Sequence, residues 1–300
     1  MTSAFNIFIQ HTSALARAGN PAAVKTLKNL LARPVSRNVS NSLSRAGVPR
    51  AFAQQYTKDK VALQTLMNTV EDVWDIPPLT INASLAILRR RYVHPDTVRV
   101  SGGSTLLKLV VRIFQNFDIA IVRELVALGA DVDAVDKNGD SVLITAAAEQ
   151  NVSIVSFLVR CGARVNAVNR DGRTAVNLAI QFENTPVVKY FIGIGATISS
   201  KDLHEAAVAD SIPICKLLLD RGLNVNFRDE QGHTALVDAA DLGHIDVVKY
   251  LLRRGTIVKP SDVQAVLKMR EEFGIDENNM NDDDREIMRL LQNAIKKRKR

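Results

Sequence analysis

The sequence has little of what a membrane-inserted or disulfide-stabilised protein requires. No apolar run approaches the ~20 residues of a membrane helix, and no basic start followed by an apolar block marks a secretory signal. Cys161 and Cys215 are the two cysteines among its 300 residues. Both stand at apolar positions of expected helices, where a buried, reduced thiol is favoured over a disulfide. We therefore expect an intracellular protein without membrane insertion.

The sequence motifs of enzymes and of cofactor sites are also missing. There is no metal-ligand spacing, nucleophile elbow, phosphate-binding loop or Gly-rich nucleotide fingerprint. Neighbouring carboxylates such as Asp131 and Asp133 stand where turns are expected, and we interpret them as solvated charges. We expect a protein with no catalytic activity, no cofactor and no metal.

Acidic residues are absent from residues 1–57, which carry seven basic ones, and the last five residues, 296–300, are all basic. The first segment fits either a basic arm or a transit segment for organelle import. The last segment fits a nuclear import signal or phosphate-contacting tail, or else positive charge placed at a helix C-terminus. A cytoplasmic or nuclear location is expected, with mitochondrial import as an alternative.

A repeat accounts for most of what the sequence does contain. The segments 136–166, 169–198 and 229–258 share the pattern D/N-x-x-G-x-T/S, followed by a short Ala-containing apolar helix. A second helix of the V-V-K-Y-L-L type follows and ends in Gly, which suits a left-handed cap. The pattern predicts turns that begin at an Asx residue and are closed by Gly139, Gly172 and Gly232. It also predicts that the first helices are capped by Ser141, Thr174 and Thr234.

This repeat resembles that of the ankyrin family, which is about 33 residues long with a T-P-L-H-x-A core. The resemblance covers roughly residues 100–296 and implies an all-α solenoid of stacked helix pairs with short β-turn fingers and helical caps. The motif proline is missing throughout, and only His204 keeps the motif histidine. The resemblance implies a scaffold role for His204 and for His244, which follows Gly243 as in the family's G-H pair.

The spacing of the repeats is uneven. Equivalent helix-start positions step by 36, 33, 27, 33 and 27 residues along Leu106, Val142, Ala175, Asp202, Ala235 and Asp262. The two short steps predict that the finger is missing before the helices that begin near Asp202 and Asp262. The long step predicts a loop insertion near Phe114–Phe117, which a surface loop tolerates.

These observations divide the chain into five parts. Residues 1–57 form the basic arm or transit segment, and residues 58–100 a helical N-terminal cap with helices expected at 60–74 and 81–93. About five ankyrin repeats occupy residues 101–258. Residues 259–295 form a C-terminal capping repeat with helices at 261–272 and 283–296, and residues 296–300 form a basic tail.

The resemblance implies an adaptor or scaffold that binds a protein partner on the concave surface made by the fingers and the first helices. The positions that map to this surface are Arg112, Lys137, Asn138, Asp140, Glu149, Arg170, Arg173, Gln181, Phe182, Glu230, His233, Asp241 and Leu242. Phe182 and Leu242 are the expected apolar anchors, flanked by Arg170 and Arg173, because aromatic and Arg residues dominate interface energetics. Packing of either apolar side chain on the next repeat is the alternative.

Two other functions remain open from the sequence. The basic ends would suit a nucleic-acid or ribonucleoprotein-associated protein, because Lys and Arg contacts to phosphate supply most non-specific affinity. The third possibility is an enzyme in which the ankyrin array serves only for recruitment. It has the least support, since no residue pattern points to a reaction.

Overall fold

The computed structural model describes residues 57–64, 84–86, 95–97, 99, 102–113, 119–149, 151–272 and 280–298. The predicted N-terminal arm lies outside them except for residue 57, as do most of the predicted N-terminal cap and the insertion predicted near Phe114–Phe117. Within these ranges the chain is helical between its turns, and its one β-feature is an isolated bridge between Val135 and Ser141. None of the helices described is long and apolar enough to cross a membrane.

The chain forms two compact units. The N-terminal unit comprises Met1–Ala146, Ser153–Arg164 and Asn169–Asp171, and the C-terminal unit comprises Ala147–Val152, Val165–Val168 and Gly172–Arg300. The elements that precede α10 in the chain are η1 (Pro95–Thr97), α6 (Leu106–Ile113), α7 (Ile119–Ala127), α8 (Val142–Ala148) and α9 (Val152–Arg160).

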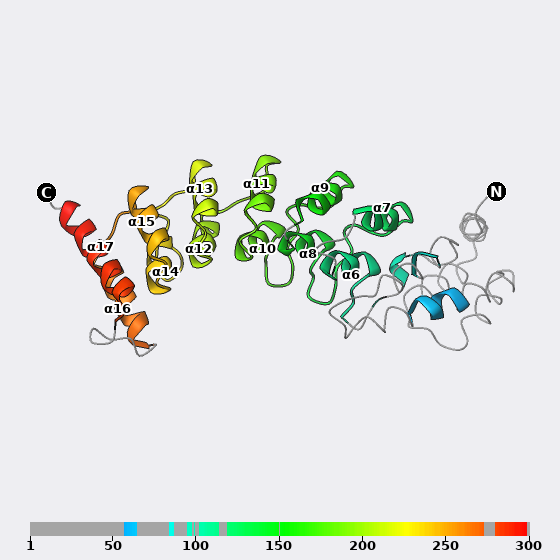
Figure 1. Cartoon of the computed structure of the whole chain (residues 1–300), viewed down its shortest axis with the longest axis horizontal. Helices are drawn as coiled ribbons and strands as arrows, with labels where there is room; N and C mark the ends of the chain where they lie inside the picture. Colours follow the sequence, from blue (N-terminus) through cyan, green and yellow to red (C-terminus); the bar gives the residue numbers. More distant parts are fainter. Residues whose placement is uncertain are drawn as a thin grey trace. The chain divides into compact units, whose positions relative to one another are not determined.

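The C-terminal unit contains four successive helix pairs. They are α10 (Ala175–Gln181) with α11 (Thr185–Gly193), α12 (Ser200–Val208) with α13 (Ile212–Asp220), α14 (Ala235–Asp241) with α15 (Ile245–Arg253), and α16 (Pro260–Glu272) with α17 (Asp282–Arg298). The first helices α10, α12, α14 and α16 pack on one another in chain order, and so do the second helices α11, α13, α15 and α17 (Figure 1). Two layers of helices result, which confirms the predicted all-α solenoid of stacked helix pairs.

Small residues allow the first helices to approach closely. Ala179, Ala206 and Ala239 are completely buried. The second helices supply larger apolar side chains, among which Val188 and Phe191 are also completely buried. Burial of each large apolar side chain contributes about 1.5–3 kcal/mol.

The predicted finger turns are present. Asp136 Oδ1 accepts hydrogen bonds from the amides of Asn138 and Asp140 at 2.8 and 3.1 Å. Asn169 and Asp229 accept the amide two residues later in the same way, at 3.0 Å each. The glycines that close the three turns have positive φ angles of 79°, 73° and 81° at Gly139, Gly172 and Gly232.

Two of the three predicted hydroxyl caps are present, and one prediction was wrong. Ser141 Oγ accepts from the Ile144 amide at 3.2 Å, and Thr174 Oγ1 accepts from the Asn177 amide at 3.3 Å. The buried hydroxyl of Thr234 makes no such bond. The Val237 amide, which it would have bound, donates to the Thr234 backbone carbonyl at 2.8 Å instead.

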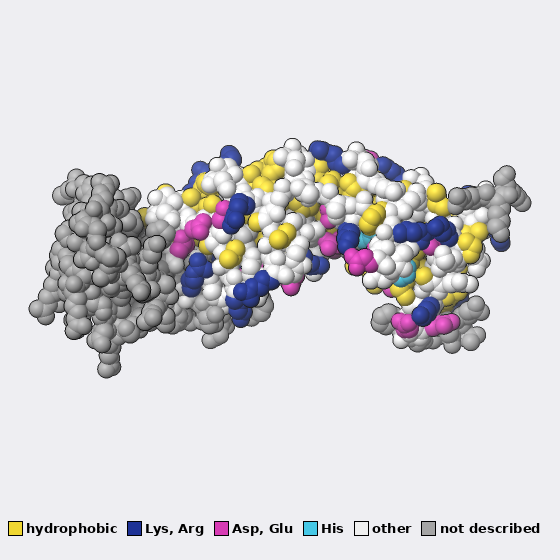
Figure 2. Space-filling model, turned by 180° about the vertical axis from the view of Figure 1, so that it is seen from behind, with side chains coloured by type: hydrophobic (Ala, Val, Ile, Leu, Met, Phe, Trp, Pro, Cys, Tyr) yellow, Lys and Arg dark blue, Asp and Glu magenta, His cyan; other side chains and the backbone are white. Residues whose placement is uncertain are grey.

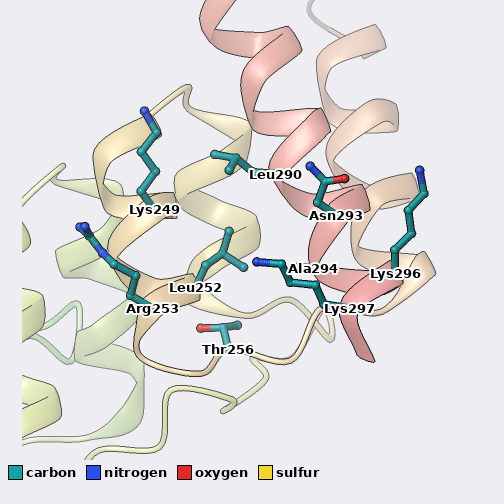
Figure 3. Close-up of a pocket in the computed structure, with 9 residues that line it drawn as sticks. All are labelled: Lys249, Leu252, Arg253, Thr256, Leu290, Asn293, Ala294, Lys296 and Lys297. Carbon is teal, nitrogen blue, oxygen red and sulfur yellow. The ribbon is translucent and has the colours of Figure 1, made fainter. Parts of the chain in front are cut away.

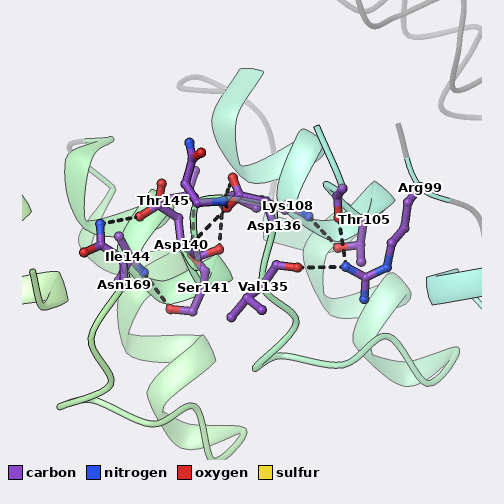
Figure 4. A network of polar contacts seen from close by, with 12 residues as sticks. Arg99, Thr105, Lys108, Val135, Asp136, Asp140, Ser141, Ile144, Thr145 and Asn169 are labelled. Carbon is purple, nitrogen blue, oxygen red and sulfur yellow. Dashed lines mark hydrogen bonds and ion pairs between the residues drawn. The ribbon is translucent and has the colours of Figure 1, made fainter. Parts of the chain in front are cut away.

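In the N-terminal unit, a buried lysine connects successive repeats (Figure 4). Lys108 Nζ lies 2.7 Å from Asp136 Oδ2 and 2.7 Å from the Asp140 carbonyl oxygen. Burial by itself would raise the pKa of Asp136, but the Lys108 ammonium and two backbone amides outweigh it and lower that pKa. Burial lowers the pKa of Lys108, and the bond to Asp136 partly offsets this effect. Asn169 Nδ2 donates to Asp140 Oδ1 at 2.7 Å, so the next finger is attached as well.

The helix α12 begins without a finger, as the short repeat step predicts, and a buried carboxylate replaces it. Asp202 is 3% exposed. Its Oδ2 accepts from the Ser199 amide at 2.7 Å, which satisfies a donor at the helix N-terminus. Its Oδ1 accepts from Asn177 Nδ2 at 2.8 Å, and this bond links α12 to the preceding repeat.

The helices α16 and α17 begin with the same device. Asp262 accepts from the Lys259 amide at 2.9 Å and binds both terminal nitrogens of Arg228, at 2.8 and 3.0 Å. Asp284, at the start of α17, forms an ion pair with the buried Arg270. The two helices lie close to the predicted ranges 261–272 and 283–296, although α17 continues through Lys297 to Arg298.

The two cysteines differ in exposure. Cys215 is completely buried in α13, and burial raises the pKa of its thiol to about 12. Cys161 is exposed, so its predicted burial was wrong. It stands one residue beyond the end of α9, where the chain turns away from the helix layer.

Candidate partner-binding face

The first helices α10, α12 and α14 expose apolar side chains near their C-terminal ends. Phe182, Val208 and Leu242 are each 50% exposed. Phe182 and Leu242 are the C-cap residues of α10 and α14, and Val208 is the last residue of α12. We call these three residues, together with the carboxylates described next, the first-helix face of the C-terminal unit.

Carboxylates lie beside these apolar residues. Glu205 precedes Val208 by three residues and Asp238 precedes Leu242 by four, spacings that place side chains on the same side of a helix. Asp241 adds a third carboxylate at the end of α14. Figure 2 shows charged side chains of both signs among exposed apolar ones on the face that it presents.

Burial makes several of these acids harder to ionise. It raises the pKa of Glu205 and that of Asp241, and nearby cations offset the effect only in part. Arg173 Nη2 lies 3.8 Å from Glu205 Oε1, too far for a hydrogen bond. Glu205 Oε2 and Asp241 Oδ1 are buried and have no hydrogen-bond partner among the described residues. Two carboxylates of the face therefore each keep a buried oxygen that no described residue binds.

His204 and His244, for which the family resemblance implies a scaffold role, connect neighbouring repeats. His204 Nδ1 lies 2.7 Å from Asp238 Oδ2, and its ring meets that of Phe227 edge-on at 5.7 Å. His244 Nε2 lies 3.0 Å from the Val208 carbonyl oxygen. Both hydrogen bonds join residues more than 30 positions apart in sequence, as expected of residues that hold repeats in register.

Among the described residues, one group of side chains has the composition of a metal site. His204, Asp229 and Asp238 offer ligand atoms that all lie within 4.8 Å of one another. Asp238 already bonds His204, and Asp229 accepts the amides of Gln231 and His233 at 3.0 and 2.8 Å. These protein partners hold the two aspartates in place and we assign no metal to the group, although His204 Nε2 is buried without a hydrogen-bond partner among the described residues.

A family model of three ankyrin repeats matches residues 108–202 and 203–262, which is more than half of the chain. The chain belongs to the ankyrin-repeat family. It is also similar to the crystal structure of the human ASB11 ankyrin repeat domain, with a TM-score of 0.54 and 22% identity. That similarity covers 64% of this chain and 84% of the other, and it shows the shared fold. A comparison with curated proteins gives no match.

Ankyrin repeats are generally protein–protein interaction modules and are typically not enzymes. In this ankyrin array the residues predicted to meet a partner differ in exposure. The exposed ones are Arg112, Lys137, Asn138, Arg170, Gln181, Phe182, Glu230 and Leu242. The half-buried ones are Asp140, Glu149, Arg173, His233 and Asp241.

Some predicted contact residues already bond within the array. The Asn138 carbonyl accepts from the Arg170 amide at 3.0 Å, and Asp140 receives the Asn169 bond described above. Lys201 and Glu230 form an exposed pair at 2.8 Å. Arg173 donates to Gln181 Oε1, which brings two predicted residues together on α10 and the finger before it.

Glu205 and Asp238 were missing from the predicted set. Glu205 and Asp238 occupy the variable position of the T-P-L-H-x-A core. When the repeats are aligned, Glu205 and Asp238 each stand one residue after the position of the motif histidine. Two other repeats have uncharged residues at this position, Thr145 and Leu178. That change of charge is the signal from which they could have been found.

Proposed function

We propose that this ankyrin protein is an adaptor that holds a protein partner on the first-helix face of the C-terminal unit. The single observation that carries the proposal is the row of half-exposed apolar residues, Phe182, Val208 and Leu242, at the ends of three successive first helices. Large apolar side chains in a row on a folded surface mark interaction sites more often than isolated ones do.

The chemistry of this face favours a partner segment that carries both apolar and basic side chains. Apolar side chains of the partner would cover Phe182 and Leu242, removing their exposed area from water. Lys or Arg side chains would meet the carboxylates of Glu205 and Asp241, each of which has an oxygen without a hydrogen-bond partner among the described residues. Complementary charge of this kind selects partners and speeds association more than it adds affinity.

The test uses the full chain, tagged and captured from its native cells after nuclease treatment, with co-purifying proteins quantified by mass spectrometry. The double variant Phe182→Ala/Leu242→Ala removes both anchors, which are half exposed and therefore not needed for the core. Truncating a residue central to an interface costs about 2 kcal/mol, so we expect the main partner to be depleted by roughly thirty-fold or more.

The matched control is Ile194→Ala/Ile257→Ala. These isoleucines are 44% and 39% exposed and follow second helices, so the control removes similar apolar area away from the first-helix face. Retention of the same partner by the control and its loss from the anchor variant would support the proposal. Equal capture by both variants would overturn it.

A charge-reversal variant separates the apolar and electrostatic parts. Glu205→Lys should slow association with a basic partner and make binding less sensitive to salt, because it removes an attractive charge. Unchanged salt dependence would show that the partner does not approach Glu205.

A further inference from the structure

The second-helix layer contains a basic pocket that the first-helix face does not use. It lies between α15 and α17 and has a volume of about 1050 Å³ (Figure 3). We call it the α15–α17 pocket, and its lining residues are Lys249, Leu252, Arg253, Thr256, Leu290, Asn293, Ala294, Lys296 and Lys297. Four of these nine side chains are basic and none is acidic.

Three of the four cations have no acidic partner among the residues that the structure describes. Lys249 Nζ lies 2.9 Å from Glu286 Oε1, and this bond lowers the pKa of Glu286. Among the described residues, no carboxylate lies within ion-pair distance of Arg253, Lys296 or Lys297. In Figure 3 the Lys297 side chain extends across the pocket toward α15.

Helix dipoles do not account for so much positive charge. The pocket lies by the C-terminal ends of α15 and α17, and each helix end is equivalent to about half a negative charge. Two ends together with Glu286 offset about two of the four cations, which leaves an excess of about two positive charges. An anionic ligand would be attracted to this excess.

The floor of the pocket distinguishes between two kinds of anion. Leu252, Leu290 and Ala294 line it and are only partly buried, so apolar surface is available between the cations. Proteins that hold single-stranded nucleic acid place aromatic side chains under the bases. None of the described residues that line this pocket is aromatic, and a phosphate backbone would leave the leucines uncovered. A peptide with acidic and apolar side chains would use both features.

We propose that the α15–α17 pocket binds an acidic peptide segment of a partner protein. An apolar side chain of the segment covers Leu252 and Leu290, and its carboxylates pair with Arg253, Lys296 and Lys297. Charge complementarity identifies the occupant, since Arg and Lys bind carboxylates through charge-assisted hydrogen bonds. This site is separate from the first-helix face, where the chemistry favours a basic partner.

The test is a selection of random twelve-residue peptides displayed on phage against the full-length protein, with bound peptides sequenced. The selected peptides are then tested for binding to the variant Lys296→Glu/Lys297→Glu, in which the charge is reversed at two exposed positions of the last helical turns. We expect one class of peptides that combines Asp or Glu with a large apolar residue. These peptides should bind the reversed variant at least tenfold more weakly in fluorescence anisotropy.

Two controls keep the result specific. Lys296→Arg/Lys297→Arg preserves the charge and should retain binding, and Phe182→Ala/Leu242→Ala should bind the acidic peptides as the wild type does. The second control separates this site from the proposed function, because either site can fail without the other. Circular dichroism checks that each variant is folded.

Four outcomes would overturn the proposal. The selected peptides could lack acidic residues, or could bind the reversed variant as tightly as the wild type. A twelve-nucleotide oligothymidine could bind the pocket and displace the acidic peptides, which would assign the pocket to nucleic acid. Sedimentation could show self-association that Lys296→Glu/Lys297→Glu abolishes, which would make a second copy of this chain the occupant.

Discussion

Removal of the Asp262 carboxylate should open the last repeats of the array selectively. Asp262 is 3% exposed, accepts the Lys259 amide and binds Arg228 through two hydrogen bonds. The variant Asp262→Ala therefore loses a helix cap and leaves a guanidinium without its anion. The two losses add because the bond to the Lys259 amide caps α16, whereas the bonds to Arg228 join α16 to the preceding repeat.

The magnitude follows from these contacts. Loss of a capping side chain costs about 1 kcal/mol. Breaking a buried ion pair costs about 3–5 kcal/mol, but the Arg228 side chain is 25% exposed and water can reach it, so we take about 2 kcal/mol for this part. The expected loss is about 3 kcal/mol, which corresponds to an increase of about a hundredfold in the opening equilibrium.

Amide hydrogen exchange read by mass spectrometry is the appropriate assay. In a repeat array each repeat contacts only its neighbours, so the loss should appear in α16 and α17 before it appears in α10. The control Glu230→Ala removes the exposed Lys201–Glu230 pair and should leave exchange in α12 and α14 unchanged. Exchange in α16 that rises less than about threefold in Asp262→Ala would refute the reasoning.

A double-mutant cycle checks the cause. Arg228→Ala/Asp262→Ala removes both partners and leaves no unpaired guanidinium, so it should cost less than the sum of the two single variants. A strictly additive cycle would show that the ion pair is not coupled and that the cap alone explains the effect.

Three further predictions concern single residues. Gly139→Ala should destabilise the protein more than Gly172→Ala does, as measured by urea denaturation. Both glycines have positive φ, but only at Gly139 would the new Cβ lie 3.0 Å from the backbone of the next finger. Equal losses of stability in the two variants would contradict this reasoning. Burial raises the pKa of Glu205 in the folded protein above its value near 4.5 in the unfolded chain. The protonated carboxyl therefore stabilises the fold below pH 4.5, and this stabilisation is lost as the pH rises through the folded-state pKa. Glu205→Gln should therefore gain urea resistance over the wild type between pH 4 and pH 7, and a pH-independent difference would argue against it. A maleimide should label Cys161 in the native protein and Cys215 only after unfolding, as mass spectrometry of the labelled peptides would show, and native labelling of Cys215 would contradict its burial.

The fingers could be predicted because their interactions are local. The Asp136 side chain bonds amides two and four residues later, and a turn of this kind is written in consecutive residues. The second-helix glycines follow from the same reasoning, since Gly195 and Gly255 have φ angles of 80° and 93° at the predicted cap positions. Local sequence also located the missing fingers near Asp202 and Asp262, although it did not say what replaces them.

The replacements depend on residues far away in sequence. Asp202 bonds Asn177, 25 residues earlier, and Asp262 bonds Arg228, 34 residues earlier. Such pairs form only once the repeats are stacked, so the sequence alone did not reveal them. Cys161 was misplaced for a smaller reason, because the predicted helix extended one residue beyond its real end at Arg160.

The candidate sites were predictable to different degrees. Exposure of Phe182 and Leu242 follows the repeat register, which fixes the side of the helix on which each residue lies. The negative charge at Glu205 could have been found from the same register. The α15–α17 pocket could not, because its volume depends on how α17 packs against α15 and has no counterpart in the repeat pattern.

The buried aspartates at the starts of α12 and α16 also show how repeats of two lengths fit into one array. A step of 27 residues lacks six residues of the 33-residue step, and with them the turn that attaches one repeat to the next. The carboxylate at the third position of the helix takes over both tasks, because it binds the amide that begins the helix and a side chain of the preceding repeat. A shortened repeat without this aspartate should therefore be less stable.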